Sequence, residues 1–385
     1  MQGLNIFIYK KEGYPKMSEE KISTLNVTLF SFAFQDYTIQ LANSLSKKNV
    51  NVLLIIPSYY LDELVNSIDK NIKVHIYDQP RLYDLRNIKL ILSFLSLIKH
   101  FNTDIVHIQG GYFWLSFALP ILKLFNYKVI VTFHDPKPHI GENYLRTRFG
   151  NFLGRLFSDR VFVHGEKMKE ILITEYNFPE KKIQTIPIGE HNVEPFRKYA
   201  QKNLQEDCNY VLFFGRIWKY KGLDYLIKAE PLISKEVPGV KLVIAGRGEN
   251  FQQYENLIVN KKNFIIYNHY ISYKEGAELF QKSSLVVLPY IDASQSGVVV
   301  TAYGFKKPVV ATNVGSIPEI VDNNITGIIV PPKDHVKLAE AIITLLRNEE
   351  LRKRMGKSGY YKLKTDLSWD KISYTTINIY KKLMN

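Results

Sequence analysis

Cysteine is almost absent from this chain: Cys208 is the only one in 385 residues. A single cysteine excludes an internal disulfide framework and a cysteine-based zinc site, which suits a reducing compartment. Long apolar runs are missing too. No stretch of eighteen or more uncharged apolar residues occurs, and residues 1–11 lack the apolar core of a signal peptide. We therefore expect a cytoplasmic protein without a membrane-spanning segment.

Other absences argue against whole classes of function. No Gly-x-Gly-x-x-Gly follows a first strand, which disfavours a nicotinamide dehydrogenase. No arginine-glycine repeat, RNP-like strand or recognition-helix pattern accompanies the basic charge, so we expect no nucleic acid as partner. Acidic residues are outnumbered, with 37 Asp and Glu against 51 Lys and Arg and a formal net charge of +14. This excess either predicts an anionic partner, such as a phosphorylated substrate or lipid, or reflects genome composition.

Short β-branched and aromatic runs alternate with helical patterns in two series. The first comprises residues 26–32, 50–57, 72–77, 104–108, 128–133, 160–163 and 182–188; the second comprises 210–214, 241–245, 263–267, 285–288, 308–311 and 327–330. This alternation predicts an α/β fold with a doubly wound parallel sheet in each half. Because 385 residues suit two domains, we predict one over 1–195 and another over 206–367, followed by a C-terminal helix over 368–385.

Two segments of the second half carry groups that bind phosphate. Gly-Arg-Ile-Trp-Lys-Tyr-Lys-Gly at 215–222 follows an apolar strand and brings Arg216 and Lys221 into one loop. Ala-Ser-Gln-Ser-Gly-Val at 293–298 precedes a short apolar helix, whose N-terminus offers backbone N–H groups to an anion. We predict a diphosphate site formed by the following residues: Arg216, Lys221, Ser296, Gly297 and Val298.

Four motifs in order give the second half its resemblance to a known family. They are Gly-Arg-x4-Lys-Gly at 215–222, Val-Ile-Ala-Gly-Arg-Gly-Glu at 243–249, Pro-Val-Val-Ala-Thr-Asn-Val-Gly-Ser-Ile-Pro-Glu-Ile-Val at 308–321 and Gly-Ile-Ile-Val-Pro-Pro-Lys-Asp at 327–334. This series resembles the retaining nucleotide-sugar glycosyltransferases of family 4 (group 1). The first half matches more loosely, at 104–110, 131–135 and 186–189.

The resemblance implies the GT-B fold: two Rossmann-like domains facing across a cleft, with the C-terminal helix crossing back to the first domain. It also implies a hexosyl-type transferase (EC 2.4) that moves a sugar from a nucleoside-diphosphate sugar to a saccharide or lipid-linked saccharide with retention, in cell-surface polysaccharide or glycoconjugate synthesis. Arg216 and Lys221 would hold the departing diphosphate. Since the sequence has no Asp-x-Asp triplet, we expect these cations to replace a metal, with no cofactor.

The sugar-binding side departs from the family pattern. The family usually carries Glu-x7-Glu, and the corresponding positions here are Ala293 and Thr301. We therefore expect sugar and ribose contacts from other groups: Asp292, Gln295 and Thr301. By resemblance, His134 at the end of strand 128–133 faces the transferred sugar, as a positioning and electrostatic catalytic group. Tyr270 and Ile271 would cover the base. The family's Gly-Gly turn is replaced by residues 34–37, and Glu319 is interpreted as a helix cap.

The segment 85–101 combines ten apolar residues with Arg86, Lys89, Lys99 and His100, and four arginines follow at 146–160. This pattern fits either a core helix with solvated cations or a peripheral surface on the inner leaflet of a membrane. Three alternatives to a glycosyltransferase stay open: a sugar-nucleotide epimerase of the same two-lobed architecture, a basic nucleic-acid-binding protein, and an inactive scaffold. The last is kept because both family carboxylates are missing.

Overall fold

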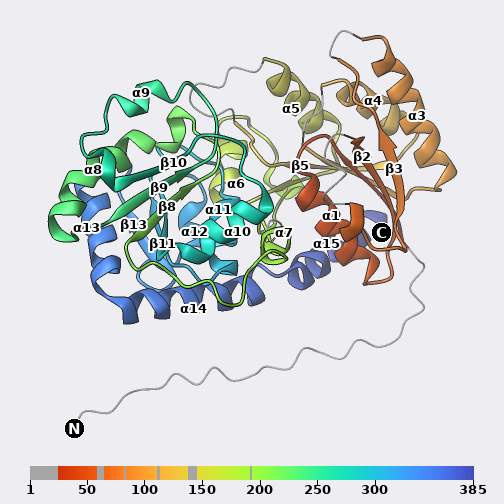
Figure 1. Cartoon of the computed structure of the whole chain (residues 1–385). Coiled ribbons are helices and arrows are strands. Elements are labelled where there is room, and N and C mark those ends of the chain that lie inside the picture. Colours follow the sequence, from red (N-terminus) through yellow and green to blue (C-terminus); the bar gives the residue numbers. More distant parts are fainter. Residues whose placement is uncertain (1–24, 59–64, 82–83, 111–112, 138–144, 191–192) are drawn as a thin grey trace.

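The computed structural model describes residues 25–58, 65–81, 84–110, 113–137, 145–190 and 193–385. Two parallel sheets, each flanked by helices, make up two domains that lie side by side (Figure 1). Every strand expected from the sequence is present, with ends that differ by a few residues. The predicted pair of doubly wound sheets is therefore confirmed.

The first sheet runs in the order β3-β2-β1-β4-β5-β6-β7, and all its neighbours are parallel. Its strands are β1 (Asn26–Ser31), β2 (Asn51–Pro57), β3 (Lys73–Tyr77), β4 (Ile105–Gln109), β5 (Lys128–Phe133), β6 (Arg160–Val163) and β7 (Ile183–Thr185). The order reverses at β1, which lies between β2 and β4. Ligands of open α/β sheets bind at the carboxyl ends of strands beside such a switch point.

Helices cover both faces of the first sheet. Alternate residues of β1 point to opposite faces: Phe30 packs with one set of helices, and Val27 and Leu29 pack with the other. On the Phe30 face lie α3 (Arg86–His100), η3 (Leu115–Phe117), α4 (Ala118–Leu124), α5 (Leu145–Phe157) and α6 (Glu166–Thr174). On the opposite face lies α1 (Gln35–Ser46). Both faces are buried, which explains the near-continuous apolar strands.

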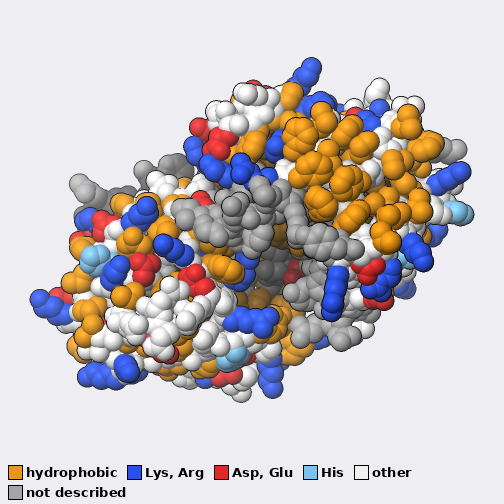
Figure 2. Space-filling view, turned by 90° about the horizontal axis from the view of Figure 1, so that it is seen from above, with side chains coloured by type: hydrophobic (Ala, Val, Ile, Leu, Met, Phe, Trp, Pro, Cys, Tyr) orange, Lys and Arg blue, Asp and Glu red, His pale blue; other side chains and the backbone are white. Residues whose placement is uncertain are grey.

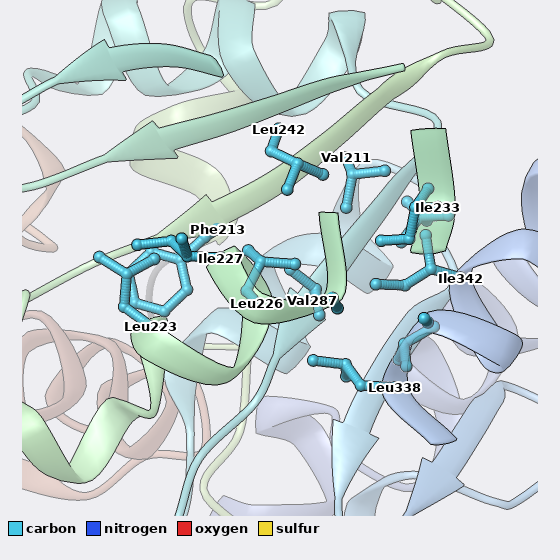
Figure 3. Packing of buried hydrophobic residues seen from close by; sticks show 14 of the residues in the cluster. Val211, Phe213, Leu223, Leu226, Ile227, Ile233, Leu242, Val287, Leu338 and Ile342 are labelled. Atoms are coloured by element: carbon cyan, nitrogen blue, oxygen red, sulfur yellow. The ribbon is translucent and has the colours of Figure 1, made fainter. Parts of the chain in front are cut away.

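The second sheet runs in the order β10-β9-β8-β11-β12-β13, also entirely parallel. Its strands are β8 (Tyr210–Phe214), β9 (Lys241–Ala245), β10 (Phe264–Tyr267), β11 (Leu285–Leu288), β12 (Val309–Thr312) and β13 (Gly327–Val330). Its helices are α8 (Leu223–Glu236), α9 (Gln252–Glu255), α10 (Tyr273–Lys282), α11 (Gly297–Gly304), α12 (Ile317–Ile320), α13 (His335–Arg347) and α14 (Glu349–Thr365). Figure 3 shows Leu223 and Ile227 of α8 beside Phe213 of β8, in the same buried cluster. This core fixes the carboxyl end of β8.

The chain returns to the first domain through its last helix. Helix α15 (Trp369–Met384) starts after the Ser368 cap, whose hydroxyl accepts from Lys371 N at 3.4 Å. It packs on α1, where Ser44 Oγ donates to the Trp369 carbonyl at 2.9 Å and lies 2.8 Å from Ser373 Oγ. The two segments belong to opposite ends of the sequence (Figure 1). The predicted crossing of the C-terminal helix is confirmed.

The carboxyl edges of the two sheets face each other. The carboxylate of Glu319, beyond β12, accepts from the backbone N–H of Glu166 at 2.7 Å and of Lys167 at 3.0 Å. Both donors lie at the N-terminus of α6, directly after β6. A second contact between the domains is the hydrogen bond that Tyr273 Oη donates to Asp36 Oδ1, at 3.0 Å. Glu319 is therefore a helix cap, as interpreted from the sequence, and the helix it caps belongs to the other domain.

Candidate functional site

The loop 215–222 follows the carboxyl end of β8 and has a glycine at each of its own ends. Gly215 has φ of 114° and Gly222 has φ of 64°, in the region that side chains rarely adopt. A Cβ on Gly222 would lie 2.0 Å from the Pro289 carbonyl oxygen. The two glycines thus let this loop pass closely against the end of β11 before α8 begins.

The two cations predicted to bind phosphate, Arg216 and Lys221, both contact tyrosines. Arg216 is exposed and donates from Nη2 to Tyr220 Oη at 3.2 Å. The Lys221 ammonium lies 3.7 Å from the centroid of the Tyr290 ring and 5.0 Å from that of Tyr220. A cation over an aromatic face is attracted to the ring quadrupole, most strongly where the pair is desolvated, and both tyrosine rings are buried. The two positive groups are therefore oriented before any anion arrives.

The segment 289–296 lies directly against this loop. The backbone N–H groups of Ile291 and Asp292 both donate to the Tyr220 carbonyl, at 2.8 and 3.4 Å. Helix α11 then begins at Gly297, and Val298 Cγ2 would lie 3.7 Å from a Cβ on Gly215. Ser296 immediately precedes this helix. The structure thus brings together the five residues that the sequence predicts for a diphosphate.

The residues predicted for the sugar and ribose differ in their surroundings. Gln295 is half-buried, and its Oε1 is a buried acceptor without a hydrogen-bond partner among the described residues. The pKa of Lys137, in the first domain, is raised mainly by its hydrogen bond to Glu175 and also by the charge of Asp292. Asp292 is half-buried, and its backbone N–H donates to the Tyr220 carbonyl. Thr301 is buried, its hydroxyl donates to the Gly297 carbonyl one turn earlier in α11 at 3.0 Å, and its assignment to the sugar or ribose stays a prediction.

Tyr270 and Ile271 lie beyond β10, beside the same edge. The Arg247 guanidinium lies 5.6 Å from the Tyr270 ring centroid, and Tyr270 is 55% exposed. Ile271 packs against the core of the second domain. The loop after β9 is joined to the 215–222 loop, since Ile217 N donates to the Arg247 carbonyl at 3.0 Å. An exposed aromatic ring thus stands near the predicted diphosphate loop, and the assignment of these two residues to the base stays a prediction.

In the first domain, His134 lies at the end of β5 and is buried beneath an aromatic ring. Phe34 stacks on it with 3.8 Å between ring centroids and 13° between the planes. His134 Nε2 lies 3.3 Å from Gln109 Oε1, and its Nδ1 lies 3.1 Å from His164 Nε2. His134 is therefore one member of a polar chain that crosses the ends of β4, β5 and β6.

The hydrogen bonds of this row of polar side chains indicate which histidine nitrogens carry a proton. The Ile186 carbonyl only accepts, so His164 donates to it from Nδ1 at 3.0 Å. Burial lowers the pKa of His164 to about 4, so its ring is neutral and Nε2 accepts from His134 Nδ1–H. At the far end His107 Nδ1 lies 2.6 Å from Tyr380 Oη, and burial lowers the His107 pKa to about 3.

Several groups of this site have no sequence signal of their own. Tyr220 and Tyr290 hold the two cations, while Gln109, His164 and Phe34 surround His134. Their position at the carboxyl end of a strand, or in the loop that follows it, is the one clue that the sequence offers. No group of three or more His, Cys, Asp or Glu side chains is placed to hold a metal ion in the part of the chain that the structure describes.

Two parallel-sheet α/β domains whose carboxyl edges face each other define a GT-B architecture. Comparison with known families agrees: residues 35–189 match the family described as Glycosyltransferase Family 4, and residues 196–362 match Glycosyl transferases group 1. The chain therefore belongs to glycosyltransferase family 4.

Individual relatives are distant. An uncharacterised glycosyltransferase of Methanocaldococcus jannaschii is 28% identical over 60% of this chain and 62% of its own length. The capsular polysaccharide biosynthesis glycosyltransferase CapM of Staphylococcus aureus is 26% identical over 54% of this chain and 57% of its own length. Both matches thus span about three fifths of the relative. The crystal structure of Anabaena HepE in complex with UDP superposes with a TM-score of 0.72 at 14% identity, over 93% of this chain and 100% of that one, which shows a shared fold.

Proposed function

We propose that this protein is a retaining glycosyltransferase that moves a sugar from a nucleoside diphosphate to a saccharide or lipid-linked saccharide acceptor. The observation that supports this most is the pair of oriented cations, Arg216 and Lys221, beside the N-terminus of α11. Glycosyl transfer leaves a nucleoside diphosphate behind, so negative charge grows there as the bond to the sugar breaks. Fixed positive groups stabilise that charge without reorganising during the reaction.

The diphosphate would lie between the loop and the helix. Arg216 can bind phosphate oxygens through a planar fork, and Lys221 supplies a point charge. The backbone N–H groups of Gly297 and Val298 lie in the first turn of α11, where they have no partner within the helix. We propose that these groups take the place of a divalent metal on the leaving diphosphate.

The sugar would lie toward the first domain. Gln295 Oε1, buried and without a partner among the described residues, is a suitable acceptor for a sugar hydroxyl. His134 would act by position and charge, since in a same-face mechanism the departing phosphate oxygen takes the acceptor proton. Gln295 thereby supplies sugar contacts where the family pair of carboxylates is replaced by Ala293 and Thr301.

The UDP bound in the HepE crystal structure and the description of CapM as a capsular polysaccharide biosynthesis glycosyltransferase suggest the biological setting. We propose a uridine or similar nucleotide donor and a role in cell-surface polysaccharide or glycoconjugate synthesis. The acceptor would then be presented on the cytoplasmic face of a membrane, with the enzyme bound peripherally.

Nucleotide binding and sugar transfer can be tested one after the other. A thermal-shift panel of UDP, GDP, ADP, CMP and dTDP identifies the nucleotide, because a ligand that binds only the folded state raises the melting temperature. The matching nucleotide sugar is then incubated with lipid-linked acceptors in the presence of a chelator, and the anomeric configuration of the product is determined by NMR. We expect transfer with retention that survives the chelator.

The roles of the two cations need matched variants. Arg216→Gln and Lys221→Gln should each lower kcat by about 100-fold or more, since removing one donor to a developing anion typically costs that much. Lys219→Gln is the control, because Lys219 is an exposed cation of the same loop with no assigned role. Equal activity of all three variants would disprove the diphosphate assignment.

A further inference from the structure

Three helices of the first domain expose apolar side chains on a single surface. Helices α3, α4 and α5 lie on one face of the first sheet, and orange side chains gather over them in Figure 2. The members of this surface, called here the helix-layer patch, are the following exposed residues: Leu85, Ile88, Leu92, Phe117, Leu124, Phe125, Phe149, Phe152 and Leu156.

The outward direction of these side chains is the unusual feature. The inner side of the same helices already buries its own apolar residues against the sheet, including Phe94 and Ile98 of α3 and Leu119 and Leu122 of α4. A helix of a soluble protein needs one apolar stripe, and its other face is normally polar. Contiguous exposed apolar side chains mark a surface that contacts another phase or molecule.

Helix α3 shows the pattern in its sequence. Leu85, Ile88 and Leu92 recur at helical spacing and are 76%, 47% and 60% exposed. Lys89 and Lys99 are exposed on the same helix, and Arg86 at its start is paired with Asp84. Helix α3 contains no acidic residue. Its outer side is thus apolar and basic together.

Aromatic contacts join α5 to the neighbouring η3 and α4. The ring of Phe149 lies 5.7 Å from that of Phe113 and 5.9 Å from that of Phe117. Phe152 and Leu156 extend the exposed stripe along α5, at 52% and 58% exposure. These rings support one another, so the patch is a preformed surface.

The charged side chains of the three helices that form the patch are all basic. Helices α4 and α5, like α3, contain no Asp or Glu, and Arg148 of α5 is exposed. Figure 2 shows Lys and Arg side chains at the rim of the apolar area. A bilayer with anionic headgroups matches this surface, since it offers negative charge at the surface and hydrocarbon just beneath. A second copy of this chain matches poorly, because equal charges would face each other.

We propose that the helix-layer patch docks this protein on the surface of a membrane that contains anionic phospholipid. The helices lie in the interfacial plane, their aromatic and aliphatic side chains enter the headgroup region, and the lysines and Arg148 bind lipid phosphates. No described helix is long and apolar enough to cross a bilayer. Figure 2 shows the hollow between the two domains on the same face as the patch. This consequence rests on the proposed function: docking would bring a lipid-linked acceptor beside that hollow.

Vesicle cosedimentation tests the docking without any catalytic step. The full chain is mixed with vesicles of phosphatidylcholine, with and without phosphatidylglycerol, and the bound fraction is measured as salt rises. We expect binding to the anionic vesicles that weakens with salt, and little binding to the neutral ones. Equal binding to both kinds of vesicle, or to neither, would overturn the proposal.

Two sets of variants separate the apolar and electrostatic contributions. Combined Leu92→Ser, Leu124→Ser and Phe152→Ser should weaken partitioning by at least about tenfold, because each exposed side chain loses its burial in lipid. Combined Lys89→Gln, Lys99→Gln and Arg148→Gln should weaken it by about fivefold per cation. The controls are Leu257→Ser, Val259→Ser and Tyr361→Ser, and Lys353→Gln, Arg354→Gln and Lys357→Gln, which change exposed residues of the second domain.

The outcomes distinguish the docking surface from the proposed chemistry. If controls and patch variants bind vesicles equally, the patch is wrong even when sugar transfer is intact. If the patch variants lose vesicle binding but keep full activity on a water-soluble acceptor, docking is supported. If gel filtration shows a dimer that the serine variants dissociate, and vesicles do not bind, the patch joins two copies and the membrane proposal fails.

Discussion

The Lys221 ammonium lies 3.7 Å from the centroid of the Tyr290 ring, so a buried aromatic at the end of one strand holds a cation from the loop of another. Tyr290 follows β11 and is 1% exposed. Burial raises its pKa to about 12, which keeps the phenol neutral, and its Oη lies 3.4 Å from Ser296 Oγ before α11. One side chain therefore contacts both parts of the predicted diphosphate site, and we regard Tyr290 as a positioning residue.

Replacing Tyr290 should separate the effect of its ring from that of its hydroxyl. Tyr290→Phe keeps the aromatic face and should change kcat/KM for the donor by no more than about threefold. Tyr290→Leu removes the face, frees the Lys221 ammonium and should lower kcat/KM about tenfold, with most of the loss in kcat if the cation acts on the developing charge. Steady-state kinetics with the nucleotide sugar measures both values.

A stability control accompanies this comparison. Tyr303 is buried in the same domain, and its hydroxyl donates to Thr326 Oγ1 at 2.6 Å. Tyr303→Leu should lower the melting temperature as Tyr290→Leu does, yet leave kcat/KM of the folded enzyme unchanged. Equal kinetic losses in both leucine variants would show that Tyr290 acts through folding alone.

Glu319 connects the two domains by capping α6, and its removal should weaken that connection. Glu319→Ala leaves the backbone N–H groups of Glu166 and Lys167 without their carboxylate acceptor and removes a negative charge from a helix N-terminus. We expect a drop in melting temperature of about 2–4 °C, the size of a lost cap in a domain of this length. Glu319→Gln should lose less, because its amide oxygen still accepts.

The control for Glu319 is a carboxylate with an exposed partner. Glu340 pairs with Lys337 within α13, at 2.8 Å and with both side chains about half exposed. Glu340→Ala should leave the melting temperature nearly unchanged, since exposed ion pairs contribute little. A Glu319→Ala variant that melts at the wild-type temperature would mean that the cap contributes nothing to the joining of the domains.

The sequence predicts the two sheets well because the information is local. Strand runs such as 210–214 and 285–288 are apolar on both faces, and glycines such as Gly222 mark where a backbone must pass closely. The sequence also predicts which loops hold cations. It does not show that Tyr290 lies under Lys221, because that contact joins residues 69 positions apart and depends on the order of β8 and β11 in the sheet. Likewise, the role of Glu319 as a cap is visible locally, and its partner helix is not.

Two of the buried histidines, His107 and His164, should make stability depend on pH. Burial is the main cause that lowers their pKa values, to about 3 and about 4, from the ordinary 6.5. As pH falls below about 6.5, the unfolded chain takes up protons on these rings while the folded chain does not, so unfolding is favoured. Each should reduce the free energy of unfolding by about 2 kcal/mol at pH 5 relative to pH 8.

Melting curves between pH 8 and pH 5 measure this dependence. His107→Gln should flatten the fall in melting temperature, since one titrating ring is gone, although it lowers the melting temperature itself. His100→Gln serves as the reference, because His100 is exposed at the end of α3. If His107→Gln falls with pH as steeply as the wild type does, His107 does not contribute to the pH dependence.

Phe34 occupies a backbone conformation that favours glycine, at φ of 67° and ψ of 38° just before α1. By resemblance, residues 34–37 stand where the family has a Gly-Gly turn, and here an aromatic residue adopts the left-handed conformation. The ring stacks on His134 with 3.8 Å between centroids, a contact that offsets part of the backbone strain. The strain and the stacking can be separated by two substitutions.

Phe34→Ala loses the stacking and keeps the strained backbone, whereas Phe34→Gly loses the stacking and relieves the strain. Phe34→Gly should therefore be more stable than Phe34→Ala by about 1 kcal/mol, the cost of a Cβ in the left-handed region. Usually glycine is the less stable of the two in a helical context, so the sign is diagnostic. Urea unfolding at neutral pH gives the difference. An alanine variant as stable as the glycine variant would show that residue 34 relaxes out of the left-handed conformation once the ring is removed.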